Sequence, residues 1–244
     1  MTIGAASAEA TFFAFLRLSS FFVVLPFPGR LVPVPAKVAL SGTLAFFLAV
    51  EPPQPAFGWG AAMLEVLLGL AAGFLLRMVV ESFTFGGELA GTQMGLASIG
   101  FFNPLETQLT LLGSGFTFLA LGLFAAGDGP LHLMAFLARW FELVPVAQAY
   151  LFSDLLEVVQ RVGTEMFHLA VSAAAPMIAS IFCAQMILAV LARSVPTLNL
   201  LIEGPGLTIA AGTIGLFASV HTFGHALLRA FDLRLEQILA WWGA

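Results

Sequence analysis

The sequence predicts an all-α, membrane-associated protein built from broken helical hairpins. Of its 244 residues, 60% are hydrophobic and only 9% are Asp, Glu, Lys or Arg, whereas about 25% of the residues of an average soluble domain are charged. The mean hydropathy is +1.00. A soluble domain of this size needs far more polar side chains to cover its surface. A soluble enzyme is therefore a poor interpretation, and one compact membrane-associated domain is expected.

The apolar residues form six to eight stretches, and a membrane-spanning helix needs about 20 such residues. The stretches cover residues 12–25, 36–50, 60–80, 83–102, 109–127, 131–150, 166–192 and 206–228. The first two are short, and four prolines separate them: Pro26, Pro28, Pro33 and Pro35. Because prolines in this number forbid a continuous helix, these two stretches are predicted to be the arms of a broken hairpin.

Several stretches carry charged residues in their interiors, namely Arg17, Glu65, Arg77, Glu88, Arg139 and Glu142. Each charge at the centre of a lipid-facing helix costs about 3 kcal/mol or more. We therefore expect these side chains to face protein or water. Apolar surfaces of this kind are usually buried against partner subunits.

Three glycines, Gly87, Gly91 and Gly95, recur at intervals of four and line one predicted helix face. Small residues at this spacing let a second backbone approach closely. Packing between helices of this chain and packing against a partner remain equally good interpretations. Either one predicts a tight helix contact.

The segment that follows, residues 97–115, is apolar and aromatic but cannot be one regular helix, because Asn103–Pro104 is a turn motif. Irregular backbone at membrane depth is tolerated only where it is buried in protein or lines a cavity. An apolar loop in a pore would act as a hydrophobic constriction. The residues concerned are Ile99, Phe101, Phe102, Asn103, Pro104 and Leu105. A plain surface turn is the alternative.

Residues 154–168 differ from the other segments because their apolar positions follow i, i+3, i+4, i+7 spacing, which predicts an amphipathic helix at a water boundary. This helix would divide a first part, 1–150, from a second, 166–244.

No catalytic, cofactor-binding or metal-binding set is expected. His221 and His225 share a helix face, but no third ligand is evident nearby. Ser114 has no recognisable base. Cys183 is the only cysteine, so it cannot form an internal disulfide, and we expect it to be buried as a small hydrophobic residue. The net charge of −5 argues against nucleic acid as a partner.

Three stretches resemble the FliR/SctT family, the export-gate subunits of flagellar and virulence type III secretion systems. They are VPVPAKVALSGTLAF (32–46), GGELAGTQMGLASIGFFNPLETQ (86–108) and the segment 175–212. The matching positions are Glu88, Gly91, Gln93, Gly95 and Pro104 in the second stretch, and Ala175, Pro176, Arg193, Pro196, Asn199 and Pro205 in the third. Asn103 stands where the family usually has aspartate.

The resemblance implies a non-enzymatic pore subunit of the flagellar export gate, which exports unfolded flagellar proteins across the inner membrane. It implies a multi-pass protein of the flagellar basal body. Residues 1–153 would be a FliP-like part and residues 154–244 a FliQ-like helical hairpin. FliP-like and FliQ-like gate subunits, FlhA-like and FlhB-like export components and the unfolded substrates would be its partners. The family's pore plug maps onto roughly Ile99–Leu112.

Two other functions remain open at this stage. The first is the virulence SctT subunit of an injectisome, which these residues do not distinguish from a flagellar one. The second is a small secondary transporter, which would need inverted repeats and a polar site at the membrane midplane. We find no internal repeat in the sequence, and the transporter is therefore the weaker alternative.

Overall fold

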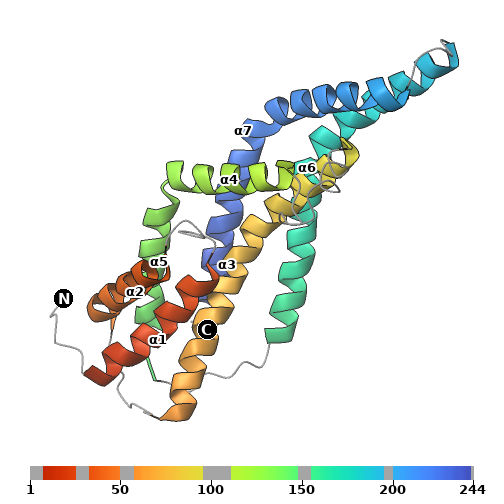
Figure 1. Ribbon diagram of the computed structural model, residues 1–244. Helices are drawn as coiled ribbons and strands as arrows, with labels where there is room; N and C mark the ends of the chain where they lie inside the picture. The colour runs from red at the N-terminus through yellow and green to blue at the C-terminus, as the bar shows by residue number, and fades with distance from the viewer. Residues whose placement is uncertain are drawn as a thin grey trace. The chain divides into compact units, whose positions relative to one another are not determined.

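The computed structural model describes residues 8–25, 33–49, 58–95, 111–147, 155–194 and 200–242, and Figure 1 shows its helices. They are α1 (Ala8–Val24), α2 (Val34–Leu48), α3 (Trp59–Gln93), α4 (Leu111–Ala126), α5 (Gly129–Leu143), α6 (Leu155–Ser194) and α7 (Leu200–Trp242). No residue in these ranges belongs to a strand. The all-α prediction is confirmed.

The predicted break between the first two apolar stretches is present. Helix α1 ends at Val24, and α2 begins at Val34 with Pro33 as its N-cap and a proline in its first turn. Proline is well tolerated there because the first N–H groups of a helix have no intrahelical acceptor. The two helices pack against each other.

The separation of residues 60–80 from residues 83–102 is wrong, because α3 is one helix of 35 residues. Only Glu81 and Ser82 interrupt the apolar pattern between them, and no proline lies there. A polar residue lowers hydropathy without removing a backbone hydrogen bond, so the helix continues through it. Residues 155–168 and 166–192 likewise lie in the single helix α6.

The chain forms two compact units. The first unit contains Met1–Val79, Phe124–Val162 and Arg229–Ala244, and the second contains Val80–Leu123 and Gly163–Leu228. Both therefore draw on distant parts of the sequence, and the division falls within helices. The predicted boundary between residues 153 and 154 lies outside the described residues and stays a prediction.

An aromatic cluster forms the core of the first unit. The Trp140 ring centroid lies 5.6 Å from that of Phe136 and 6.1 Å from that of Phe21. All three side chains are buried. Burying each contributes about 1.5–3 kcal/mol, so this cluster ties α1 to α5.

Glycines allow α1 and α3 to touch along their backbones. A Cβ atom on Gly73 would lie 2.7 Å from the carbonyl oxygen of Phe21, and one on Gly69 would collide with the Arg17 carbonyl and the Ser20 hydroxyl. Neither position can hold a larger residue unless the helices separate.

In the second unit, α6 and α7 pack antiparallel. Gly212 of α7 faces Ile181 of α6, and Gly215 faces Met177. Phe223 of α7 also packs on Phe83 of α3 and Phe116 of α4, with ring centroids 4.4 and 5.1 Å apart. Helices α3, α4, α6 and α7 therefore share one core here.

Among the described residues, two helices are long and apolar enough to cross a membrane, and the number of candidate spans rises to four if each of two bent helix pairs counts as one span. In the most apolar 18-residue segment of α3, 50% of the residues are buried, but in that of α6 only 22% are buried. Cys183 lies in α6 and is exposed, so the prediction that this residue is buried is wrong. It lies on a helix that this chain covers poorly, and hydropathy alone does not distinguish such a surface from a core.

The crossing of α1 and α3 gives the first testable prediction. Gly73→Leu should destabilise the protein by about 1–3 kcal/mol or more, because the new side chain must displace the backbone of α1. The thermal midpoint of the purified protein measures this. Gly60→Leu is the matched control, since Gly60 lies on the same helix and has nothing within 4 Å of a Cβ atom. Equal midpoints for the two variants would contradict the prediction.

Candidate functional site

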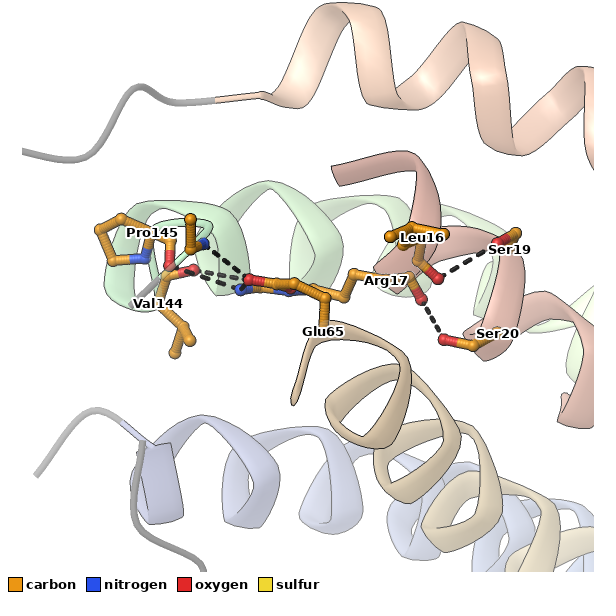
Figure 2. Close-up of polar contacts among 8 residues, drawn as sticks. Leu16, Arg17, Ser19, Ser20, Glu65, Val144 and Pro145 are labelled. Carbon is orange, nitrogen blue, oxygen red and sulfur yellow. Dashed lines mark hydrogen bonds and ion pairs between the residues drawn. The ribbon is translucent and has the colours of Figure 1, made fainter. Parts of the chain in front are cut away.

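Arg17 of α1 and Glu65 of α3 form an ion pair in the interior of the first unit (Figure 2). Arg17 Nε donates to Glu65 Oε2 at 2.5 Å and Arg17 Nη2 donates to Glu65 Oε1 at 3.0 Å. The exposed fractions of the two residues are 0% and 1%. This two-pronged geometry is the strongest that a guanidinium and a carboxylate can form.

The pair also fixes the backbone that follows α5. Arg17 Nη1 donates to the Val144 carbonyl at 2.6 Å and Nη2 to the Pro145 carbonyl at 3.4 Å. The amide of Ala147 donates to Glu65 Oε1 at 2.8 Å. Ala147 has a φ of 57°, a left-handed conformation that costs an alanine roughly 1–2 kcal/mol. Its hydrogen bond to Glu65 helps to hold it there.

Two aromatic rings complete the surroundings of Arg17. Its Cζ atom lies 5.2 Å from the ring centroid of Trp140 and 5.0 Å from that of Phe141. A guanidinium over an aromatic face is attracted by the negative charge of the ring face. The expectation that Arg17 and Glu65 face protein or water is therefore correct, and protein encloses both. Their pairing was not anticipated, although opposite charges in two separate apolar segments suggest it.

The second unit contains the end of α3, where several predicted site residues lie. Gly86 packs against the carbonyl of Ala170 in α6, and Gly87 against Phe116 in α4; a Cβ atom would lie 2.8 and 2.9 Å from these neighbours. Gly91 is buried. The residues flanking the candidate plug on its N-terminal side are thus held by two other helices.

Gly95 differs from its prediction as a packing residue. It lies after the last residue of α3, is exposed and has a φ of 82°. Among the described residues, nothing lies within 4 Å of a Cβ atom built on it. Glycine is favoured at a left-handed position that ends a helix. The spacing of four residues between the glycines therefore continues past the end of α3, and Gly95 is not on the helix face that holds Gly87 and Gly91.

The Glu88 carboxylate lies against Gly113, in the first turn of α4. The N–H groups in the first turn of a helix and the helix dipole favour a negative charge at this position. Nearby, the hydroxyls of Thr84 and Thr117 are 2.7 Å apart and hydrogen-bonded. Helix α4 is thus fastened to α3 where the chain emerges from residues 96–110. Glu88 is half-buried, whereas Arg77 of α3 is exposed.

The remaining predicted site residues divide into two groups. Gln93 is the exposed last residue of α3, Pro176 lies within α6, and Arg193 is exposed in the last turn of α6. The others lie outside the described residues, and these are Ile99, Phe101, Phe102, Asn103, Pro104, Leu105, Pro196 and Asn199.

No group of three potential metal ligands occurs within the described part of the chain. His225 is exposed, and the side chain of His221 is not among those described. The contacts described so far are contacts of packing and anchoring between helices.

Comparison with known proteins identifies the family. The model of the bacterial export proteins, family 1, matches residues 8–233. The chain belongs to this family. The match to the bacterial export family includes residues of both compact units and runs through every helix from α1 to α7.

Several proteins named flagellar biosynthetic protein FliR are similar to this chain. The protein from Aquifex aeolicus is 29% identical over 215 residues, which cover 85% of this chain and 83% of the relative. The protein from Bacillus subtilis is 29% identical over 240 residues, or 92% and 91% of the two chains. The protein from Escherichia coli K12 is 29% identical over 198 residues, or 78% and 76%.

The buried ion pair gives the second prediction. Arg17→Met should lower the free energy of unfolding by about 3–5 kcal/mol, because Glu65 would remain buried without its cation. The double variant Arg17→Met with Glu65→Leu should recover much of this loss, since no charge is then buried. Thermal unfolding of the single and double variants measures both effects.

An exposed pair supplies the control. His132 Nδ1 and Asp232 Oδ1 are 2.9 Å apart, with the two side chains 51% and 48% exposed. His132→Ala should leave the thermal midpoint nearly unchanged, because exposed pairs contribute little. A loss in Arg17→Met no larger than the loss in His132→Ala would contradict the importance of the buried pair.

Proposed function

We propose that this protein is a pore subunit of the flagellar type III export gate, through which unfolded flagellar proteins cross the inner membrane. The observation that carries this proposal is the match to the bacterial export family over residues 8–233, together with relatives that bear the name flagellar biosynthetic protein FliR. The proposed role is non-catalytic, as the resemblance to the export-gate family implies.

The distribution of apolar surface supports a subunit that works in a larger assembly. The most apolar window of α6 is only 22% buried by the rest of the chain. Large apolar side chains are exposed along α6 and α7, among them Phe182, Ile187, Ile214 and Phe217. Apolar surface of this extent needs lipid or protein to cover it. FliP-like and FliQ-like subunits are the proposed cover, with FlhA-like and FlhB-like components as further partners of the gate.

We assign the pore plug to residues 99–105, as the resemblance implies. Support comes from the two flanks of this segment, because α3 and α4 are packed together by Gly87, Phe116, Thr84 and Thr117. Firmly held flanks are what a plug needs if its apolar side chains are to return to one place after each export event.

The flagellar role is preferred to an injectisome role because the named relatives are flagellar proteins. Membership of an export family also favours export over the small secondary transporter. We further propose, from the resemblance, that residues 1–153 are FliP-like and residues 154–244 are FliQ-like.

The assembly proposal predicts that partners are needed for stability. Co-expression with FliP-like and FliQ-like proteins, followed by purification through a tag on this chain, should yield a complex. Gly91→Leu should reduce the yield of that complex by more than Gly60→Leu, since Gly91 is buried and Gly60 is exposed. Recovery of only a stable lone monomer from the wild-type co-expression would overturn the proposal.

The plug proposal predicts leakage. Replacing Phe101 and Phe102 together by alanine should leave the assembled gate intact but raise the leak of ions or small solutes. Each large side chain that seals a pore contributes about 1.5–3 kcal/mol, so the double change should raise the open population by about a hundredfold or more. Leakage is followed in cells, with secretion measured in parallel.

The matched control replaces another adjacent pair of phenylalanines. Phe46 and Phe47 of α2 are 69% and 71% exposed, and their replacement by alanine should cause no leak. A gate that assembles with the Phe101 and Phe102 changes, yet leaks no more than wild type, would show that the segment is a structural turn.

A further inference from the structure

The last turn of α3 is held by side chains from α6 and α7. Met94, the residue directly after α3, is 2% exposed. Its amide still donates to the Ala90 carbonyl at 3.0 Å, so it closes the helix. Thr208 of α7 contacts its carbonyl oxygen at 3.3 Å, and Gln185 of α6 reaches the carbonyl of Gln93 at 3.5 Å.

Gly212 provides the space that the Met94 side chain fills. A Cβ atom on Gly212 would collide with the Met94 terminal methyl group, and would lie 3.1 Å from both Met94 Cγ and Ile181 Cδ1. The Met94 side chain therefore lies in a notch in α7 that only glycine leaves open. Methionine is flexible enough to fill an irregular space of this kind.

The hydroxyl of Thr208 has three carbonyl oxygens within reach and one proton to donate. Those of Gly204 and Pro205 are at 3.2 and 3.0 Å, and that of Met94 is at 3.3 Å. The first two belong to the interior of α7 (Leu200–Trp242), where carbonyls accept from backbone amides. Carbonyls at the end of a helix have no intrahelical donor. The Met94 carbonyl therefore gains most from the proton, and Thr208 is 7% exposed.

We propose that Thr208 and Gly212 are positioning residues, which lock the C-terminal end of α3 onto the α6–α7 pair and so fix the point from which the chain enters residues 96–110. This inference rests on the proposed export-gate function, because that segment includes the proposed plug. The anchor couples α6 and α7 to the start of the segment.

Hydrogen exchange of the assembled complex tests the anchor directly. The amides of Met94 and Gly95 donate to Ala90 and Thr92 and report fraying of the end of α3. Thr208→Val keeps the shape of the side chain and removes the hydroxyl. It should speed exchange of these amides by about fivefold, the effect of losing one net hydrogen bond. Thr208→Ser, which keeps the hydroxyl, should restore the wild-type rate.

Matched controls lie on the same helix. Thr213 is exposed and its hydroxyl donates to Ile209 within α7, so Thr213→Val should leave the rate unchanged. Gly212→Ala should speed exchange by displacing Met94, whereas Gly206→Ala should not, because nothing lies within 4 Å of a Cβ atom at Gly206. Equal exchange rates in Thr208→Val and Thr213→Val, together with no change in Gly212→Ala, would overturn the anchor.

Leakage through the gate tests the functional half separately, with the double alanine variant of Phe101 and Phe102 in parallel. Thr208→Val should assemble normally and leak more than Thr213→Val. If exchange is faster in Thr208→Val but leakage rises only in the phenylalanine variant, the anchor does not position the plug and the inference fails. If the phenylalanine variant itself does not leak, the plug proposal fails, and the functional role of the anchor fails with it.

Discussion

The ion pair between Arg17 and Glu65 is the constraint on which the arrangement of the first unit depends. An unpaired charge in an apolar interior costs several kcal/mol, so neither residue can be buried unless the other is present. The pair therefore selects the one register of α1 against α3 that brings Arg17 next to Glu65. The Arg17 guanidinium also requires the carbonyls of Val144 and Pro145 to lie beside it, because its N–H donors need these acceptors once water is excluded. Glycines at positions 69 and 73 bring the backbones close enough for this to happen.

In the second unit, the register of the apolar helices is set by glycine contacts and threonine hydrogen bonds, without a buried ion pair among the contacts described above. Its contacts depend on missing side chains, since Gly86, Gly87, Gly212 and Gly215 each admit an atom of a neighbouring helix at a distance no Cβ atom would allow. Threonine hydroxyls then supply specificity between otherwise similar apolar surfaces, as the bond between Thr84 and Thr117 illustrates. Such contacts are short in range, so even a small displacement of α7 would change the packing around Met94. This sensitivity is what makes the end of α3 a good place for coupling.

The parts of this fold that the sequence predicts are those set by local chemistry. Prolines 26–35 predict the break between α1 and α2, and the cost of a charge in an apolar segment predicts that Arg17 and Glu65 are enclosed. Their pairing depends on contact between residues 48 positions apart, which no periodicity encodes. The continuity of α3 was missed because Glu81 lowers hydropathy without breaking a helix, and Cys183 was misplaced because an apolar run looks the same whether this chain or a partner covers it. Gly91 is buried within α3 whereas Gly95 is exposed after its end, and equal spacing in the sequence does not show where a helix ends.

Helix α3 shows why length and hydropathy are insufficient to describe the surroundings of this protein. It is long and apolar enough to cross a membrane, yet Glu65 in its first half is satisfied inside the protein and Arg77, twelve residues further on, is exposed. A rise of about 1.5 Å per residue puts these positions roughly 18 Å apart along the axis, which is within the hydrocarbon depth that such a helix would span. Arg77 facing lipid at that depth would cost about 3 kcal/mol. The surface around Arg77 is therefore better matched to water or to a polar partner, while the poorly covered apolar face of α6 is matched to lipid or to an apolar one. A single subunit with both kinds of surface is suited to surroundings that cover its apolar face and leave the surface around Arg77 in contact with water or a polar neighbour.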